Sequence, residues 1–185
     1  MCGISGELAL EPGRTASSAA LVAMTDSLAH RGPDGEGHFI EGVVGLGHRL
    51  LAITDPAPSG HQPMAGAGGR YHLVFDGEIY NAPDLRRCLE DDGHVFKGQS
   101  DTEVLLRLFE TRGEDCLNQL NGMFAFAVWD REAQNLFLAR DPFGIKPLYY
   151  RNDGKRLLFA SEVKAILAAL GRHAEVDVQA LDDYV

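Results

Sequence analysis

Cysteine is scarce in this chain of 185 residues, which contains only three. A disulfide scaffold needs more cysteines, so we expect all three to be free thiols. Positive charge is also in short supply, because 17 Lys and Arg face 27 Asp and Glu and leave a formal net charge of −10. Phosphate backbones and anionic membrane surfaces would be repelled by this charge, so neither nucleic acid nor a membrane is an expected partner.

Long apolar runs and targeting signals are lacking as well. The most apolar stretch, residues 122–129, has 8 residues, against the roughly 20 needed to span a bilayer. The first residues, MCGISGELALEPG, have neither a basic segment nor a long apolar one, so no signal peptide is expected and the predicted location is cytoplasmic. Neither a GxGxxG motif nor a P-loop occurs, and no His or Cys spacing is typical of zinc, so we predict no cofactor or metal in this chain.

The chain does have enough apolar side chains, at 45% of its residues, to build the core of one domain. Helical patterns follow Ser17, Asn81, Ser100 and Ser161. Alternating patterns typical of strands come in a separate cluster that we interpret as one antiparallel meander, at residues 124–128, 136–140, 147–150 and 157–160. Because strands and helices cluster instead of alternating, the predicted fold class is α+β with antiparallel sheets.

Cys2 is the residue whose position says most about chemistry. Removal of Met1 would leave a cysteine that carries its own α-amino group. An α-amine titrates near 7.7 to 8.0 and a thiol near 8.5, so the neutral amine can accept the thiol proton. Nucleophile and base would then belong to one residue; the alternative is that Cys2 merely begins a buried strand.

Several motifs occur in an order that resembles a known family: MCGISG (1–6), HRGPD (30–34), GHRLLAITD (47–55), FDGEIYN (75–81) and ARDPFGIKPLYY (139–150). The chain is similar to the glutaminase domain of asparagine-synthetase-type glutamine amidotransferases, which are class II, N-terminal-nucleophile hydrolases. The resemblance implies a four-layer αββα sandwich over residues 1–176. Residues 177–185 would begin a synthetase domain that this chain lacks, and ATP and Mg are expected only there. It also implies L-glutamine as substrate and allows a homodimer.

The resemblance also implies site residues. Cys2 would attack the amide of glutamine and form a thioester. Arg49 would bind the substrate carboxylate, as suits a bidentate guanidinium, and Glu78 and Asp101 would hold the substrate ammonium. Backbone groups near Ile53 would line the same pocket. Two alternatives stay open: Arg49 as a surface residue at a strand end, and Asp101 as an acid that stabilises a helix dipole.

Asp76 departs from the family pattern. The family has an Asn-Gly-Glu motif, whose Asn side chain and Gly backbone N–H donate to the oxyanion, whereas this chain has Asp76, Gly77 and Glu78. Gly77 keeps its N–H, but an ionised Asp76 has no proton to donate. Asp-Gly after an apolar strand is also a strong turn signal, and we interpret the pair as a turn that aims the Gly77 N–H.

The remaining motif residues have plainer interpretations. His30 and Arg31 are expected to brace the strand that carries Cys2, or simply to favour a helix C-terminus, while Cys88 and Cys116 are expected to be core thiols. Because of Asp76, two other functions are kept beside glutamine hydrolysis. One is an impaired module that stabilises or regulates a synthetase, and the other is a free-standing amidase with a different small substrate.

Overall fold

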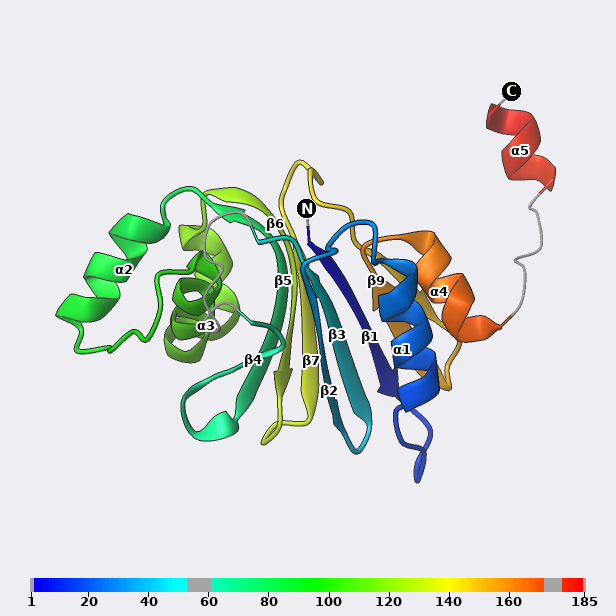
Figure 1. The fold of residues 1–185 in the computed structure, drawn as a ribbon, viewed down its shortest axis with the longest axis horizontal. Coiled ribbons are helices and arrows are strands. Elements are labelled where there is room, and N and C mark those ends of the chain that lie inside the picture. Colours follow the sequence, from blue (N-terminus) through cyan, green and yellow to red (C-terminus); the bar gives the residue numbers. More distant parts are fainter. Residues whose placement is uncertain (1, 53–60, 172–177, 185) are drawn as a thin grey trace.

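Two antiparallel sheets lie face to face, with helices on the outer side of each, so the chain forms four layers in the order αββα (Figure 1). The structure is a computed structural model, and it describes residues 2–52, 61–171 and 178–184. The α+β sandwich predicted from the sequence is confirmed.

The first sheet has the strand order β2 (Gly35–Glu41), β3 (Val44–Leu50), β1 (Gly3–Ala9), β9 (Arg156–Ala160), β8 (Tyr149–Asn152). β1 is the central strand, and it pairs with β3 on one side and with β9 on the other. Cys2 directly precedes this central strand. The predicted nucleophile therefore lies at the end of the most enclosed strand of the sheet.

The second sheet has the order β4 (Met64–Ala65), β5 (Tyr71–Ile79), β6 (Gly122–Asp130), β7 (Asn135–Arg140). β5 and β6 pair over their full length. Asp76 and Gly77 therefore lie inside a continuous strand, and the predicted turn is wrong. Every residue of β5 has a partner in β6, and this pairing overrides the local preference of the Asp-Gly dipeptide.

Helices cover both outer faces. α1 (Ser18–Ser27) and α4 (Val163–Leu170) lie on the first sheet, and α2 (Ala82–Asp91) and α3 (Asp101–Arg112) lie on the side of the second (Figure 1). Short 3-10 helices span Ala67–Gly69 and Gly113–Gln119, and α5 spans Val178–Tyr184. Ser17 and Ser100 cap α1 and α3 as predicted. No helix within the described ranges is long and apolar enough to cross a membrane.

Side chains that alternate along the strands divide the core. Ile4, Leu46, Val74 and Trp129 are buried in a cluster between the two sheets. Leu73, Phe75 and Ile79 of β5 instead join the cluster that packs under α2 and α3. Because successive side chains of a strand point to opposite faces, Asp76 shares the face of Val74 and points toward the first sheet.

The predicted four-strand meander is wrong in one respect. β7 belongs to the second sheet, whereas β8 and β9 pair in the first. The turn after β7 carries the chain across, and the Asp141 carboxylate holds this turn by accepting the backbone N–H groups of Phe143, Ile145 and Lys146. The crossing brings the segment around Lys146 to the junction of the two sheets.

Candidate active site

Cys2 is half-buried and directly precedes the first residue of β1. Its Sγ lies 3.5 Å from the backbone N–H of Leu51, which donates to it, and 3.9 Å from the Leu51 carbonyl. Burial raises the pKa of the Cys2 thiol and the charge of Asp76 adds to the rise, while the Leu51 hydrogen bond and the charge of Lys146 oppose it. The thiol therefore needs a base before it can act as a nucleophile.

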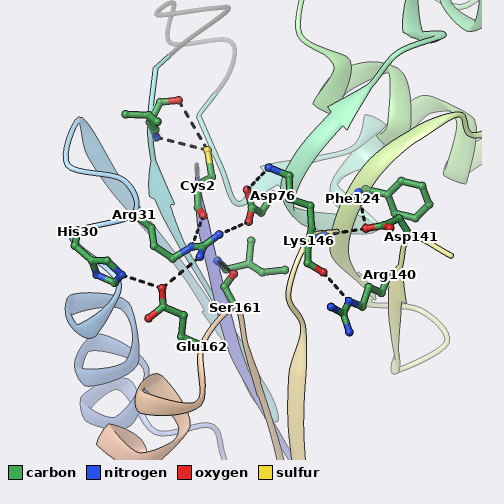
Figure 2. A network of polar contacts seen from close by, with 12 residues as sticks. Cys2, His30, Arg31, Asp76, Phe124, Arg140, Asp141, Lys146, Ser161 and Glu162 are labelled. Carbon is green, nitrogen blue, oxygen red and sulfur yellow. Dashed lines mark hydrogen bonds and ion pairs between the residues drawn. The ribbon is translucent and has the colours of Figure 1, made fainter. Parts of the chain in front are cut away.

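Arg31 joins the two sheets at this point (Figure 2). Its Nε donates to the carbonyl of Cys2 at 2.8 Å, and its Nη2 donates to Asp76 Oδ2 at 2.8 Å. The third branch, Nη1, lies 3.3 Å from Glu162, which also bonds to His30 at 2.8 Å. The prediction that Arg31 braces the Cys2 segment is confirmed, and His30 reaches the same network through Glu162.

Asp76 is buried, with 1% of its side chain exposed, and is flanked by two cations. Arg31 bonds to Oδ2, and the ammonium of Lys146 lies 3.8 Å from Oδ1. Burial raises the pKa of the Asp76 carboxyl, and the charges of Lys146 and Arg31 oppose that rise. The negative charge of Asp76 is therefore paired with two cations. Sequence reasoning missed Lys146, because nothing in its local pattern separates a buried lysine from a solvated one.

Gly77 presents its N–H at an unpaired edge of β5. The N–H groups of Phe75 and Ile79 point away from β6. The first donates to Gln62 Oε1 at 2.6 Å and the second to Asp101 Oδ2 at 3.0 Å. Strand N–H groups two residues apart share a side, so the Gly77 N–H points to the same edge. It has no acceptor among the described residues. A Cβ at Gly77 would lie 2.4 Å from the carbonyl oxygen of Met123, so only glycine fits.

Glu78 and Asp101, predicted to hold an ammonium, line one pocket of about 390 Å³. Asp101 is the first residue of α3, and burial raises the pKa of its carboxyl while the hydrogen bond from Ile79 opposes the rise. The charge of Glu78 adds to the rise in the pKa of Asp101. The structure thus brings these two acids together. The pocket is lined by Glu78, Ile79, Tyr80, Ala82, Pro83, Gln99, Ser100 and Asp101.

Arg49 does not join the residues around Cys2 and Asp76. Its guanidinium bonds to the carbonyl of Thr25 at 3.0 Å and pairs with Asp26 at 2.5 Å and Glu36 at 2.8 Å. These contacts place its side chain on the face of the first sheet that α1 covers, away from Asp76. Binding of a substrate carboxylate stays a prediction for Arg49. Ile53 lies outside the described residues.

The other two cysteines lie apart from the thiol of Cys2. Cys116 is buried, and burial raises its pKa to about 12, which confirms a core thiol. Cys88 is exposed, so its predicted place in the core is wrong. On α2 the side chains that pack inward are those of Ala82, Leu85 and Leu89. Within the described ranges, no group of three or more His, Cys, Asp or Glu residues could hold a metal ion.

The fold, two antiparallel sheets face to face with helices on both outer sides, is shared with solved structures of known proteins. Two of them are an allosteric regulatory enzyme of purine biosynthesis (TM-score 0.77) and the glutamine phosphoribosylpyrophosphate amidotransferase of B. subtilis (TM-score 0.75). Each is 24% identical to this chain, and each match covers 91% of this chain and 43% of the other.

The sequence comparisons narrow the class to a family. The model of the glutamine amidotransferase domain matches residues 1–185, and the chain belongs to this family. Asparagine synthetase [glutamine-hydrolyzing] 3 of Bacillus subtilis is 44% identical over 99% of the chain, and Amidase chry2 of Gibberella zeae is 38% identical over 99%. The chain spans about 30% of the length of the first relative and 29% of the second.

Proposed function

We propose that this domain hydrolyses L-glutamine to glutamate and ammonia, with Cys2 as the nucleophile. The observation that carries the proposal is the Arg31 bridge, which ties the backbone of Cys2 to Asp76. The bridge brings the thiol to the strand segment whose next residue, Gly77, has an unused N–H. A nucleophile beside a fixed backbone donor is the arrangement that acyl transfer requires.

Removal of Met1 precedes the reaction and gives Cys2 a free α-amine. That amine takes the thiol proton, and Sγ attacks the side-chain amide carbon of glutamine. A C–S bond forms as the carbonyl π electrons move to oxygen, and the Gly77 N–H donates to that oxyanion. When the carbonyl re-forms, the C–N bond breaks and ammonia leaves with the proton held by the amine. Water then attacks the thioester, which releases glutamate and restores the thiol.

The charged end of glutamine has a matching pocket. Glu78 and Asp101 provide two carboxyl groups on one wall, where a substrate ammonium would be paired. The pocket begins at β5 directly after Gly77, so a ligand held there can extend its amide back toward the oxyanion donor. This arrangement favours a small amino-acid amide over a neutral amide.

We further propose that the ammonia serves an ATP-dependent, asparagine-synthetase-like domain in a cytoplasmic protein. The relatives named asparagine synthetase support this, since the chain covers about 30% of the first one's length. A second candidate is hydrolysis of another small amide, which is supported by the relatives named Amidase chry2 and Amidase chyE, each 38% identical. Release of ammonia from glutamine, compared with a panel of other primary amides, separates the two candidates.

The test of the nucleophile compares Cys2→Ala with Cys88→Ala. Cys2→Ala is expected to abolish ammonia release from glutamine, whereas Cys88→Ala, which removes an exposed thiol on α2, keeps full activity. Intact mass is measured on the same samples, because only the protein without Met1 has its free α-amine on Cys2. Half of the wild-type activity in Cys2→Ala, or full activity in a protein that retains Met1, contradicts the mechanism.

A further inference from the structure

Lys146 is the buried cation of the site that the mechanism above leaves unused. Its backbone is fixed on both sides, because its N–H donates to Asp141 at 3.0 Å and its carbonyl accepts from Arg140 Nε at 2.6 Å. Only 6% of its side chain is exposed. The turn after β7 therefore holds this lysine firmly and directs its long side chain inward, toward Asp76 (Figure 2).

The ammonium of Lys146 has donors to spare. Its one ion pair in the described part of the chain is with Asp76 Oδ1, at 3.8 Å, which is too long for a hydrogen bond. An ammonium has three N–H donors, and no hydrogen bond among the described residues uses one of these three. Arg31 connects the ammonium to Cys2, since Arg31 bonds both to the Cys2 carbonyl and to Asp76, the partner of Lys146.

The other charged groups at this point are already hydrogen-bonded. Each nitrogen of the Arg31 guanidinium has an acceptor, on Cys2, Asp76 or Glu162. Asp76 accepts from Arg31, and as a carboxylate it has no proton to donate. Lys146 is thus the cationic side chain, among the described residues around Asp76, whose charged group makes no hydrogen bond.

We infer that the Lys146 ammonium donates the second hydrogen bond to the oxyanion that forms when Cys2 attacks the amide, a role that Asp76 leaves empty. The inference rests on the proposed glutamine hydrolysis. Asp76 then has a second role, because its charge holds the Lys146 ammonium in the site. The N–H donors of Lys146 stay available to the oxyanion, since the contact with Asp76 is a 3.8 Å ion pair and not a hydrogen bond.

The test begins with Lys146→Met, which keeps the length of the side chain and removes its charge and donors. Loss of one oxyanion donor typically lowers kcat by about 10² to 10³, so we expect a fall in that range with KM for glutamine changed less than about twofold. Lys155→Met is the matched control, because the Lys155 side chain is 67% exposed and its ammonium lies 3.9 Å from Glu11 in a surface ion pair. Its kcat is expected to equal that of the wild type.

Two double variants separate a donor from a mere counter-charge. If Lys146 only neutralises Asp76, then Asp76→Leu and Asp76→Asn should both restore the activity of Lys146→Met, because both remove the negative charge. If Lys146 is a donor, only Asp76→Asn restores it, by at least about tenfold, because the Asn amide can donate and Leu cannot. Equal rescue by both substitutions overturns the inference.

Different results contradict the proposed function and the role of Lys146. A wild-type protein that lacks Met1 and releases no ammonia from glutamine removes the proposed function, and the inference with it. A wild type that is active, with a kcat unchanged in Lys146→Met, removes the inference alone. If Lys146→Met does not fold, Lys146→Ala is measured in its place, because its side chain also has no donor, and a kcat lowered by about 10² to 10³ supports the inference. Wild-type kcat in Lys146→Ala contradicts it.

Discussion

Arg31→Met is the substitution whose effect on stability follows most directly from the structure. Arg31 and Asp76 form a buried pair, with side-chain exposures of 8% and 1% and a separation of 2.8 Å. Removing one partner of such a pair typically costs about 3–5 kcal/mol, because a buried charge loses its counter-charge. Lys146 still lies 3.8 Å from Asp76 and compensates in part. We therefore expect a loss near the lower end of that range, about 3 kcal/mol.

Thermal unfolding followed by circular dichroism measures this loss. For a domain of this size, 1 kcal/mol corresponds to about 2–4 °C in Tm, so Tm should fall by roughly 6–12 °C. Arg14→Met is the control, since the pair between Arg14 and Glu11 is 40% and 42% exposed. A surface pair of this kind contributes about 0–1 kcal/mol, so its Tm should change little.

A double-mutant cycle with Asp76→Asn tests the physical reason. If the loss arises from the unpaired carboxylate, the double variant is more stable than the sum of the two single effects predicts. A Tm within 2 °C of the wild type for Arg31→Met would refute the reasoning. Additive effects around the cycle would do the same, because they would show that the two side chains do not stabilise one another.

Three further predictions concern the remaining polar groups. Arg49→Lys should lower Tm, because Arg49 bonds to Asp26 and Glu36. It should also raise KM for glutamine, because lysine lacks the bidentate fork predicted to bind the substrate carboxylate; an unchanged KM would remove Arg49 from the substrate site. Asp101→Asn should raise KM more than it lowers kcat, since it removes a charge from the ammonium pocket, and steady-state kinetics check this. Burial lowers the pKa of His48 from its ordinary 6.5 to about 3, so between these values the unfolded chain binds a proton that the folded protein excludes. The free energy of unfolding should fall as pH drops through this range, by up to about 1.4 kcal/mol per pH unit. His48→Asn should flatten the slope in urea titrations, and the exposed His38→Asn should not.

Local patterns in the sequence were sufficient for the fold class and for the hypothesis that Cys2 is the nucleophile. Alternation along residues 124–128 predicts a strand with two unlike faces, and Ser17 and Ser100 mark helix starts that the structure has. These features depend on neighbours one to four positions away, so the chain specifies them without its tertiary structure. The position of Cys2 is likewise a property of the sequence itself.

The composition of the site was decided only by tertiary structure. Full pairing of β5 with β6 places Asp76 inside a strand, although the Asp-Gly dipeptide by itself favours a turn. The crossing between sheets after β7 brings Lys146 to Asp76, and the end of α1 brings Arg31. Arg49 points to α1 because the register of β3 decides its face, and a shift of one residue would turn every side chain over. Contacts between residues far apart in the chain depend on register and on which face each strand presents, and no local pattern carries that information.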